Sequence, residues 1–162
     1  MDDKHKFSGL IDKEKYQVFL LACPGSVPFN FALHPWFVVN RQGTIFRWEV
    51  MHRKVEHRTS WGHLYKDFFS PFQGTEVFVF SQKYFWQAKL LGKIEGEAAK
   101  RAAEFIEKSP SAYPYCEKYI LTGPNSNTFA QWVLNQFPEF TVALPGNCIG
   151  KKYQLQAFPK NR

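Results

Sequence analysis

A first group of candidate functional residues lies in the segment 122–129, Thr-Gly-Pro-Asn-Ser-Asn-Thr-Phe. Gly123-Pro124 predicts a turn, and Asn125 is a good helix N-cap, with Thr128 three residues later. The segment therefore predicts that Ser126 lies in the first turn of a helix. The residues that follow at helical spacing, up to the break at Pro138, are Phe129, Trp132, Val133 and Phe137.

Ser126 at this place has two interpretations. The free N–H groups and the positive end of the dipole at a helix N-terminus favour an anion or an oxyanion, which suits a nucleophile. A segment that only caps the helix would show the same sequence pattern. Local sequence alone favours this capping role over a nucleophile.

A second candidate group comes from a predicted β-hairpin. Residues 30–40 and 44–52 read as strands, and Asn40-Arg41-Gln42-Gly43 between them reads as the turn. If the hairpin closes symmetrically on Arg41-Gln42, His34 stands directly opposite Glu49.

The face of the hairpin that carries His34 and Glu49 also carries Trp36 and Arg47. A carboxylate can hold an imidazole in one tautomer and raise its basicity, as a general base requires. A purely structural cross-strand ion pair fits the same pattern, and a one-residue bulge would break the pairing. The sequence leaves these alternatives open.

The remaining pattern predicts an α+β fold, with an antiparallel sheet packed against helices. We expect one domain over residues 1–162, with polar tails at 1–14 and 154–162. The other expected strands are Tyr16–Cys23, Glu76–Phe80 and Phe140–Leu144, and the expected helices are Lys83–Leu91 and Gly96–Lys108.

Composition narrows the class of protein. The chain has 162 residues, a net charge of +7 and 17 Phe. The charge permits an anionic partner, but the basic residues are scattered and no nucleic-acid recognition motif occurs, so we do not expect nucleic-acid binding. Three cysteines without close spacing argue against a disulfide framework, and the spacing of His52, His57 and His63 matches no metal motif. We therefore predict no metal and no cofactor.

The N-terminal residues are charged and lack the apolar core of a signal peptide, and no apolar run is long enough to span a bilayer. This favours a cytoplasmic protein. If the chain is trimmed from a longer one, it could instead be membrane-associated or exported.

Several motifs together resemble an uncharacterised bacterial family, the domain of unknown function numbered 3750. The likeness runs from about Tyr16 to Tyr153, and the family has no established activity. The motifs are His34-Pro35-Trp36, Arg47-Trp48-Glu49-Val50, Tyr113-Pro114-Tyr115, Gly123-Pro124-Asn125-Ser126-Asn127-Thr128-Phe129, Leu144-Pro145-Gly146-Asn147 and Ile149-Gly150-Lys151.

The chain order also resembles that of circularly permuted papain-like proteins, including the lecithin:retinol acyltransferase group and NlpC-type endopeptidases. That resemblance implies a papain-like fold in which His34 is the base, Glu49 orients it, and Ser126 replaces the usual cysteine. The residues predicted to bind the ligand are Trp36, Arg47, Asn125 and Asn127.

Serine in place of cysteine matters because a serine hydroxyl does not ionise at neutral pH and depends on a well-aligned base. Two functions therefore remain open. One is a hydrolase or acyl/amide transferase that acts on a small-molecule, peptide or lipid-like substrate. The other is an inactive relative that binds an anionic or acyl ligand. The oligomeric state is not predicted.

Overall fold

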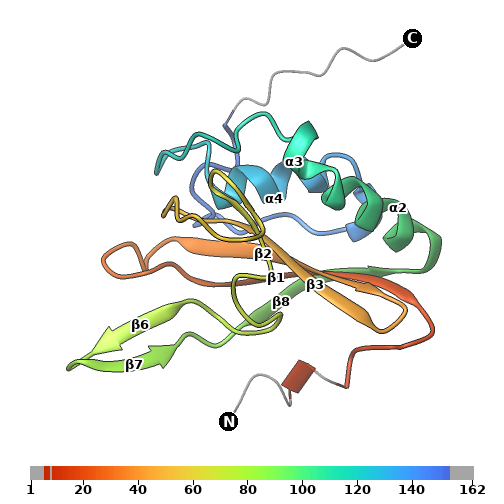
Figure 1. Ribbon diagram of the computed structural model, residues 1–162, viewed down its shortest axis with the longest axis horizontal. Coiled ribbons are helices and arrows are strands. Elements are labelled where there is room, and N and C mark those ends of the chain that lie inside the picture. The colour runs from red at the N-terminus through yellow and green to blue at the C-terminus, as the bar shows by residue number, and fades with distance from the viewer. Residues whose placement is uncertain (1–5, 8, 154–162) are drawn as a thin grey trace.

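The computed structural model describes residues 6–7 and 9–153 (Figure 1). Its centre is a six-stranded antiparallel sheet in the order β4-β5-β3-β2-β1-β8, and β6 and β7 form a separate two-stranded ribbon. The strands are β1 (Tyr16–Pro24), β2 (Leu33–Arg41), β3 (Thr44–Val50), β4 (Ser60–Trp61), β5 (Leu64–Lys66), β6 (Glu76–Val79), β7 (Gln82–Phe85) and β8 (Lys89–Glu95).

The helices cover one face of this sheet (Figure 1). The side of α2 that faces the sheet is formed mainly by small residues, which allows the helix to approach β1 closely. Those buried residues are Ala99, Ala102, Ala103 and Ile106. The helices are α2 (Gly96–Glu107), α3 (Ser109–Ala112), α4 (Ser126–Leu134) and the 3₁₀ turn η1 (Pro138–Phe140).

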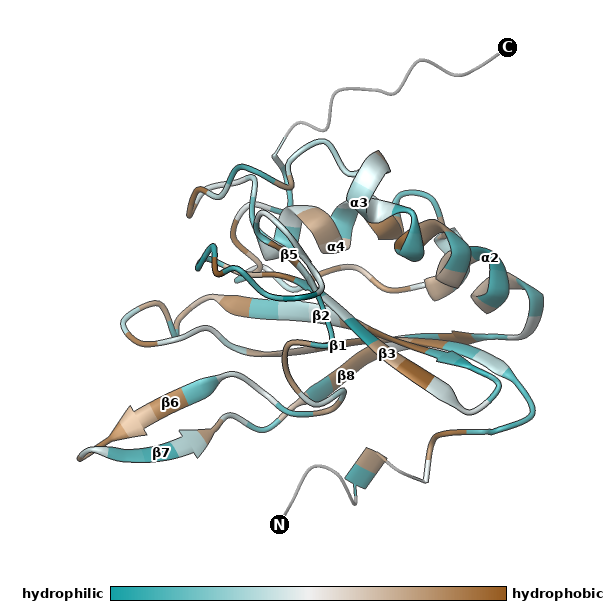
Figure 2. Cartoon of the chain, viewed as in Figure 1, coloured by the Kyte–Doolittle hydropathy of each residue, from teal (hydrophilic) through white to brown (hydrophobic). Residues whose placement is uncertain are grey.

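The central strands are buried on both faces, and each face has its own core. On β1, Val18 and Leu20 pack on the helix side, whereas Phe19, Leu21 and Cys23 pack on the opposite side. Figure 2 shows apolar residues along β1 and on α4. Because successive side chains of a strand point to opposite faces, the position of a residue in its strand decides which core it joins.

The β2–β3 hairpin forms as expected, but its register differs by two residues from the prediction. Arg41 pairs with Thr44, so the turn is Gln42-Gly43 and not Arg41-Gln42. Both turn residues have positive φ, 48° and 95°, as the tight turns favoured in hairpins require, and glycine adopts this conformation without strain. A two-residue shift keeps every side chain on its predicted face.

Three other expectations are wrong. The segment predicted as a helix at Lys83–Leu91 contains β7 and the start of β8, because it pairs with β6 and with β1. The expected last strand, Phe140–Leu144, is instead the end of η1 followed by irregular chain. The predicted polar lead-in includes Phe7, which is buried and stacks on Phe72 with ring centroids 5.4 Å apart. The tail predicted at 154–162 lies outside the described residues.

Candidate functional site

Helix α4 begins with a capping box, as the sequence predicts. The side-chain oxygen of Asn125 accepts hydrogen bonds from the backbone N–H groups of Asn127 (3.0 Å) and Thr128 (3.3 Å). In return, Thr128 Oγ1 accepts from the backbone N–H of Asn125 at 3.1 Å. These bonds satisfy donors that a helix N-terminus would otherwise leave free, so fewer of them remain for a ligand.

The two predicted binding asparagines hold backbone segments together. Asn125 Nδ2 donates to the carbonyl oxygens of Leu121 (2.8 Å) and Ile149 (3.0 Å). Asn127 Nδ2 donates to the carbonyl oxygens of Ile149 (2.9 Å) and Leu33 (3.0 Å). Their amide donors therefore fix the loop after residue 144 against α4 and the start of β2.

The close approach of this loop to α4 requires a glycine at residue 150. Its φ is +93°, and a Cβ at this position would lie 2.5 Å from Asn125 Nδ2. Its carbonyl oxygen accepts a 2.8 Å hydrogen bond from Thr128 Oγ1. Side chains at the start of α4 thus hold the loop at two consecutive residues, Ile149 and Gly150.

Ser126 is buried at the first position of α4, and its hydroxyl lies beside that of Tyr119. Burial raises the pKa of Tyr119, although Ser126 lowers it in part, so Tyr119 stays neutral at physiological pH and is no base for the serine. The rings of His52 and His63 lie against Tyr119, with centroids 5.4 Å and 5.5 Å away. This histidine–tyrosine group is absent from the sequence prediction, because its members come from loops without a recognisable spacing.

His34 and Glu49 are in contact despite the shifted register. His34 Nε2 lies 2.9 Å from Glu49 Oε2, because the two residues are diagonal neighbours on the same face of the hairpin. Arg47 NH2 donates to the same oxygen at 2.8 Å, and Arg47 Nε lies 2.8 Å from the other carboxylate oxygen, although only the NH2 contact has good hydrogen-bond geometry. The carboxylate of Glu49 therefore contacts both His34 and Arg47.

Arg47 is fully buried and ties this cluster to the segment that covers it. Its NH1 donates to the carbonyl oxygens of Ser70 (2.9 Å) and Gln73. Its guanidinium carbon lies 4.3 Å from the centre of the Trp36 ring. Burial alone would raise the pKa of Glu49, but Arg47 and His34 together hold it below its ordinary value. Glu49 is therefore ionised, and the ion pairs compensate its burial.

The structure does not bring Ser126 to His34. Phe37, on the helix-side face of β2, packs against Phe129 of α4 with ring centroids 6.0 Å apart. His34 has the opposite orientation and stacks on Trp36, in the core on the other face (centroids 6.2 Å apart). The sheet thus lies between the histidine and the helix that carries the serine, and the catalytic roles of Ser126, His34 and Glu49 stay predictions.

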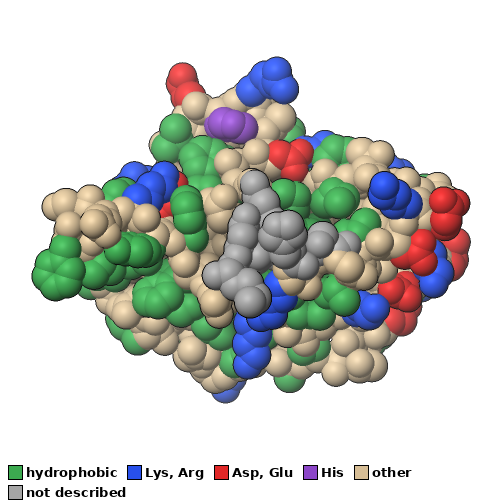
Figure 3. Space-filling model, turned by 90° about the horizontal axis from the view of Figure 1, so that it is seen from below, with side chains coloured by type: hydrophobic (Ala, Val, Ile, Leu, Met, Phe, Trp, Pro, Cys, Tyr) green, Lys and Arg blue, Asp and Glu red, His purple; other side chains and the backbone are tan. Residues whose placement is uncertain are grey.

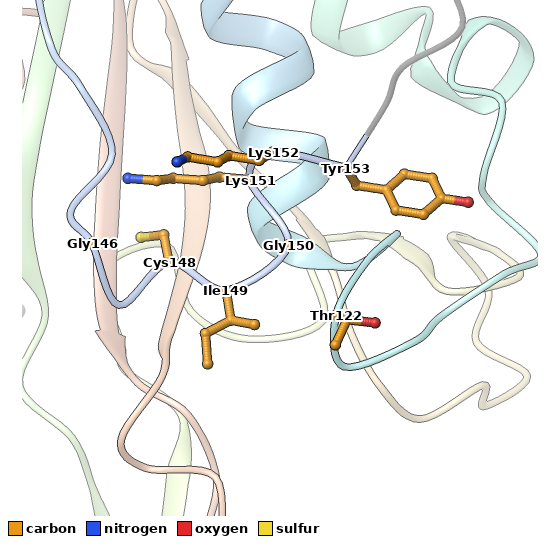
Figure 4. Close-up of a pocket in the computed structure, with 8 residues that line it drawn as sticks. All are labelled: Thr122, Gly146, Cys148, Ile149, Gly150, Lys151, Lys152 and Tyr153. Carbon is orange, nitrogen blue, oxygen red and sulfur yellow. The ribbon is translucent and has the colours of Figure 1, made fainter.

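A pocket of about 410 Å³ opens beside the loop that α4 anchors (Figure 4). Lys151 Nζ donates to the carbonyl oxygens of Leu144 and Pro145 (2.8 Å for the latter), which leaves one of its three N–H groups for a ligand. Lys152 is exposed. Figure 4 shows both lysine side chains extending in the same direction from the loop. The pocket is lined by Thr122, Gly146, Cys148, Ile149, Gly150, Lys151, Lys152 and Tyr153.

Cys148, which lines this pocket, is a poor nucleophile. It is almost fully buried, and burial raises the pKa of its thiol to about 11. Over residues 6–7 and 9–153, no group of three or more His, Cys, Asp or Glu side chains is arranged to hold a metal ion. None of the helices in this same part of the chain has the length and apolar character to span a bilayer.

The chain belongs to the family described as proteins of unknown function (DUF3750), whose model matches residues 15–153. No curated protein and no solved structure matches the chain. The expected α+β class and antiparallel sheet are confirmed, whereas the papain-like architecture that the sequence suggested is not.

Proposed function

We propose that this chain is a binding domain for a small anionic ligand, such as a carboxylate or a phosphate, held in the pocket at residues 146–153. The observation that supports this most directly is the charge of the pocket. Lys151 and Lys152 both line it, and none of the eight lining residues is acidic. An anion in the pocket is attracted by these two positive charges, and no lining carboxylate opposes it.

The rigidity of the loop adds to this proposal. Asn125, Asn127 and Thr128 hold the backbone of the loop at Ile149 and Gly150 through three hydrogen bonds between 2.8 and 3.0 Å. A further bond of 3.0 Å from Asn127 fixes the neighbouring start of β2 at Leu33. A ligand site on a pre-organised loop loses less conformational entropy on binding than one on a mobile loop. The motif Gly123-Pro124-Asn125-Ser126-Asn127-Thr128-Phe129 thus supports the pocket from behind, and none of its residues lines it.

The alternative prediction, a hydrolase or transferase that uses Ser126, has less support. Its proposed nucleophile is buried beside a neutral tyrosine, and the histidine that contacts Glu49 lies on the other side of the sheet. A serine hydroxyl without an aligned base is a weak nucleophile. Ser126 is better explained as part of the helix start that positions the loop.

Calorimetric titration with inorganic phosphate and with citrate tests this proposal. We expect Lys152→Ala to weaken binding by about tenfold or more, because a hydrogen bond to a charged group contributes about 1.5–3 kcal/mol. Lys108→Ala is the matched control, since Lys108 is also an exposed lysine but lies at the end of α2 and does not line the pocket.

Ser126→Ala separates the two functions in the same experiment. A binding domain keeps its affinity for the anion when the serine hydroxyl is removed, provided that the fold is kept. Absence of heat with both anions, or equal affinity of the wild type and Lys152→Ala, would contradict the proposal. Ester or amide hydrolysis that Ser126→Ala abolishes would favour the enzyme instead.

A further inference from the structure

The β6–β7 ribbon exposes several large apolar side chains. Phe80 is 97% exposed and Phe78 is 65% exposed, and Val79, Tyr84 and Phe85 are exposed as well. The ribbon projects from the body of the molecule, and its outer end is apolar (Figures 1 and 2). Large exposed apolar patches on soluble proteins mark surfaces that bind a partner or a membrane.

A second apolar projection lies at the same end of the molecule. The loop between β1 and β2 exposes Val27, Phe29 and Phe31, the last at 59%. Figure 1 shows this loop and the ribbon extending toward the same end of the long axis, and Figure 3 shows hydrophobic side chains gathered there. We call these eight residues the aromatic end: Val27, Phe29, Phe31, Phe78, Val79, Phe80, Tyr84 and Phe85.

The conformation at the tip of the ribbon costs stability. Phe80 and Ser81 form the two-residue turn, with φ of 48° and 63°. Hairpin turns of this kind favour asparagine and glycine, because a bulky side chain is strained at positive φ. A phenylalanine placed there and left almost fully exposed contributes nothing to the fold, so its presence indicates a role outside the fold.

The shape of the tip distinguishes between possible occupants. Phe78 and Val79 are consecutive strand residues, so they point to opposite faces of the ribbon, and both are exposed. A rigid protein surface covers one face of such a ribbon. Fluid lipid surrounds it on all sides, and aromatic side chains are favoured at the boundary between headgroups and acyl chains.

The charge of the aromatic end fits a bilayer with anionic headgroups. Residues 24–33 carry no charge, and residues 76–90 carry one acid, Glu76, against Lys83 and Lys89. Glu76 pairs with Lys83 at 2.5 Å, and Lys89 is exposed. The chain as a whole has a net charge of +7. Lys89 therefore leaves one uncompensated positive charge beside the ribbon, and the net positive charge of the whole chain adds to the attraction to acidic lipids.

We propose that the aromatic end inserts into the interface of a membrane that contains anionic lipids, and so holds the domain peripherally on that membrane. The ribbon tip enters the boundary between headgroups and acyl chains, and the β1–β2 loop enters beside it. This inference does not depend on the anion pocket.

Vesicle sedimentation tests the proposal, with phosphatidylcholine vesicles that contain or lack about a quarter phosphatidylserine. We expect the wild type to sediment with the anionic vesicles and the double variant Phe78→Ser/Phe80→Gly to bind at least about tenfold more weakly, because two aromatic side chains no longer enter the interface. Glycine at residue 80 removes the ring and the backbone strain together, so this variant keeps its fold.

Ile120→Ser is the matched control, since Ile120 is an exposed apolar residue outside the aromatic end and its loss should leave vesicle binding unchanged. Light scattering of the lipid-free protein at the same concentrations completes the experiment. Failure of the wild type to bind either vesicle, or equal binding by the double variant, would overturn the proposal. So would a dimer that the double variant dissociates, because the aromatic end would then be an interface between two copies.

Discussion

Glu49 is the residue whose environment departs most from that of an ordinary surface carboxylate. It is buried, it bonds to Arg47 and His34, and Arg47 in turn has no exposed surface. Removal of one partner leaves a buried charge without compensation, which costs more than the pair itself contributes. We therefore expect Glu49→Gln to lower the free energy of unfolding by about 3 kcal/mol or more in urea denaturation.

The control is Glu107→Gln, which removes a partly exposed ion pair with Arg41 (3.0 Å) and should cost less than about 1 kcal/mol. Similar decreases in the free energy of unfolding in the two variants would show that the buried cluster stabilises the fold no more than a surface ion pair does.

The same carboxylate makes stability depend on pH. The pKa of Glu49 is lowered in the folded state, so below the ordinary glutamate value of about 4.3 the unfolded chain binds more protons than the folded one. The contribution of Glu49 is therefore complete above this value and is lost as the pH falls through the lowered pKa. Unfolding curves of Glu49→Gln should depend less on pH in this range than those of the wild type, and parallel curves would contradict the assignment.

Among the structural elements, α4 and the loop at residues 144–153 act as one unit through Asn125. Asn125→Asp keeps the oxygen that caps the helix but loses the donors to Leu121 and Ile149. We expect amide hydrogen exchange at residues 149–153 to become about tenfold faster or more, because the loss of one hydrogen bond of about 1.5 kcal/mol favours local opening.

Asn125→Ala is the comparison, because it loses the cap as well and should cost about 1 kcal/mol in addition. Unchanged exchange in Asn125→Asp would mean that other contacts hold the loop, and the pocket would then owe nothing to this residue.

The hairpin shows which features of an element can be derived from the sequence. The alternation that places His34, Trp36, Arg47 and Glu49 on one face is correct, since a register shift of two residues does not change it. The register itself depends on which two residues adopt positive φ. The symmetric turn on Arg41-Gln42 leaves Gly43 outside the two central positions, whereas in the structure Gly43 is one of them. The pattern at Lys83–Leu91 predicts a helix, because a short apolar run does not distinguish the period of a helix from that of a strand.

At the scale of the whole molecule, the sheet decides which candidate residues can act together. The sequence correctly places His34 with Glu49, and Ser126 at a helix start. It does not state which face of the sheet the helix covers. A usable signal was nevertheless present, since the apolar side chains of Leu33, Phe37 and Val39 alternate with His34 and mark the face on which helices pack.

The pocket and the histidine–tyrosine group were beyond prediction for a different reason. Lys151, Lys152, Tyr119 and His63 come from irregular segments, whose relative positions depend on long-range hydrogen bonds such as those of Asn125 and Asn127. The hydrophobic periodicity of the sequence does not predict such long-range contacts. The sequence therefore predicts the scaffold of this domain better than its site.

Amide chemical shifts on titration with inorganic phosphate test most directly whether a small anion binds at the loop anchored by α4. We predict that shift changes concentrate at residues 146–153 and at Thr122, and that the amides of His34 and Glu49 stay unaffected on the other side of the sheet. Changes centred on His34 and Glu49, or no saturable change at all, would contradict anion binding at this loop.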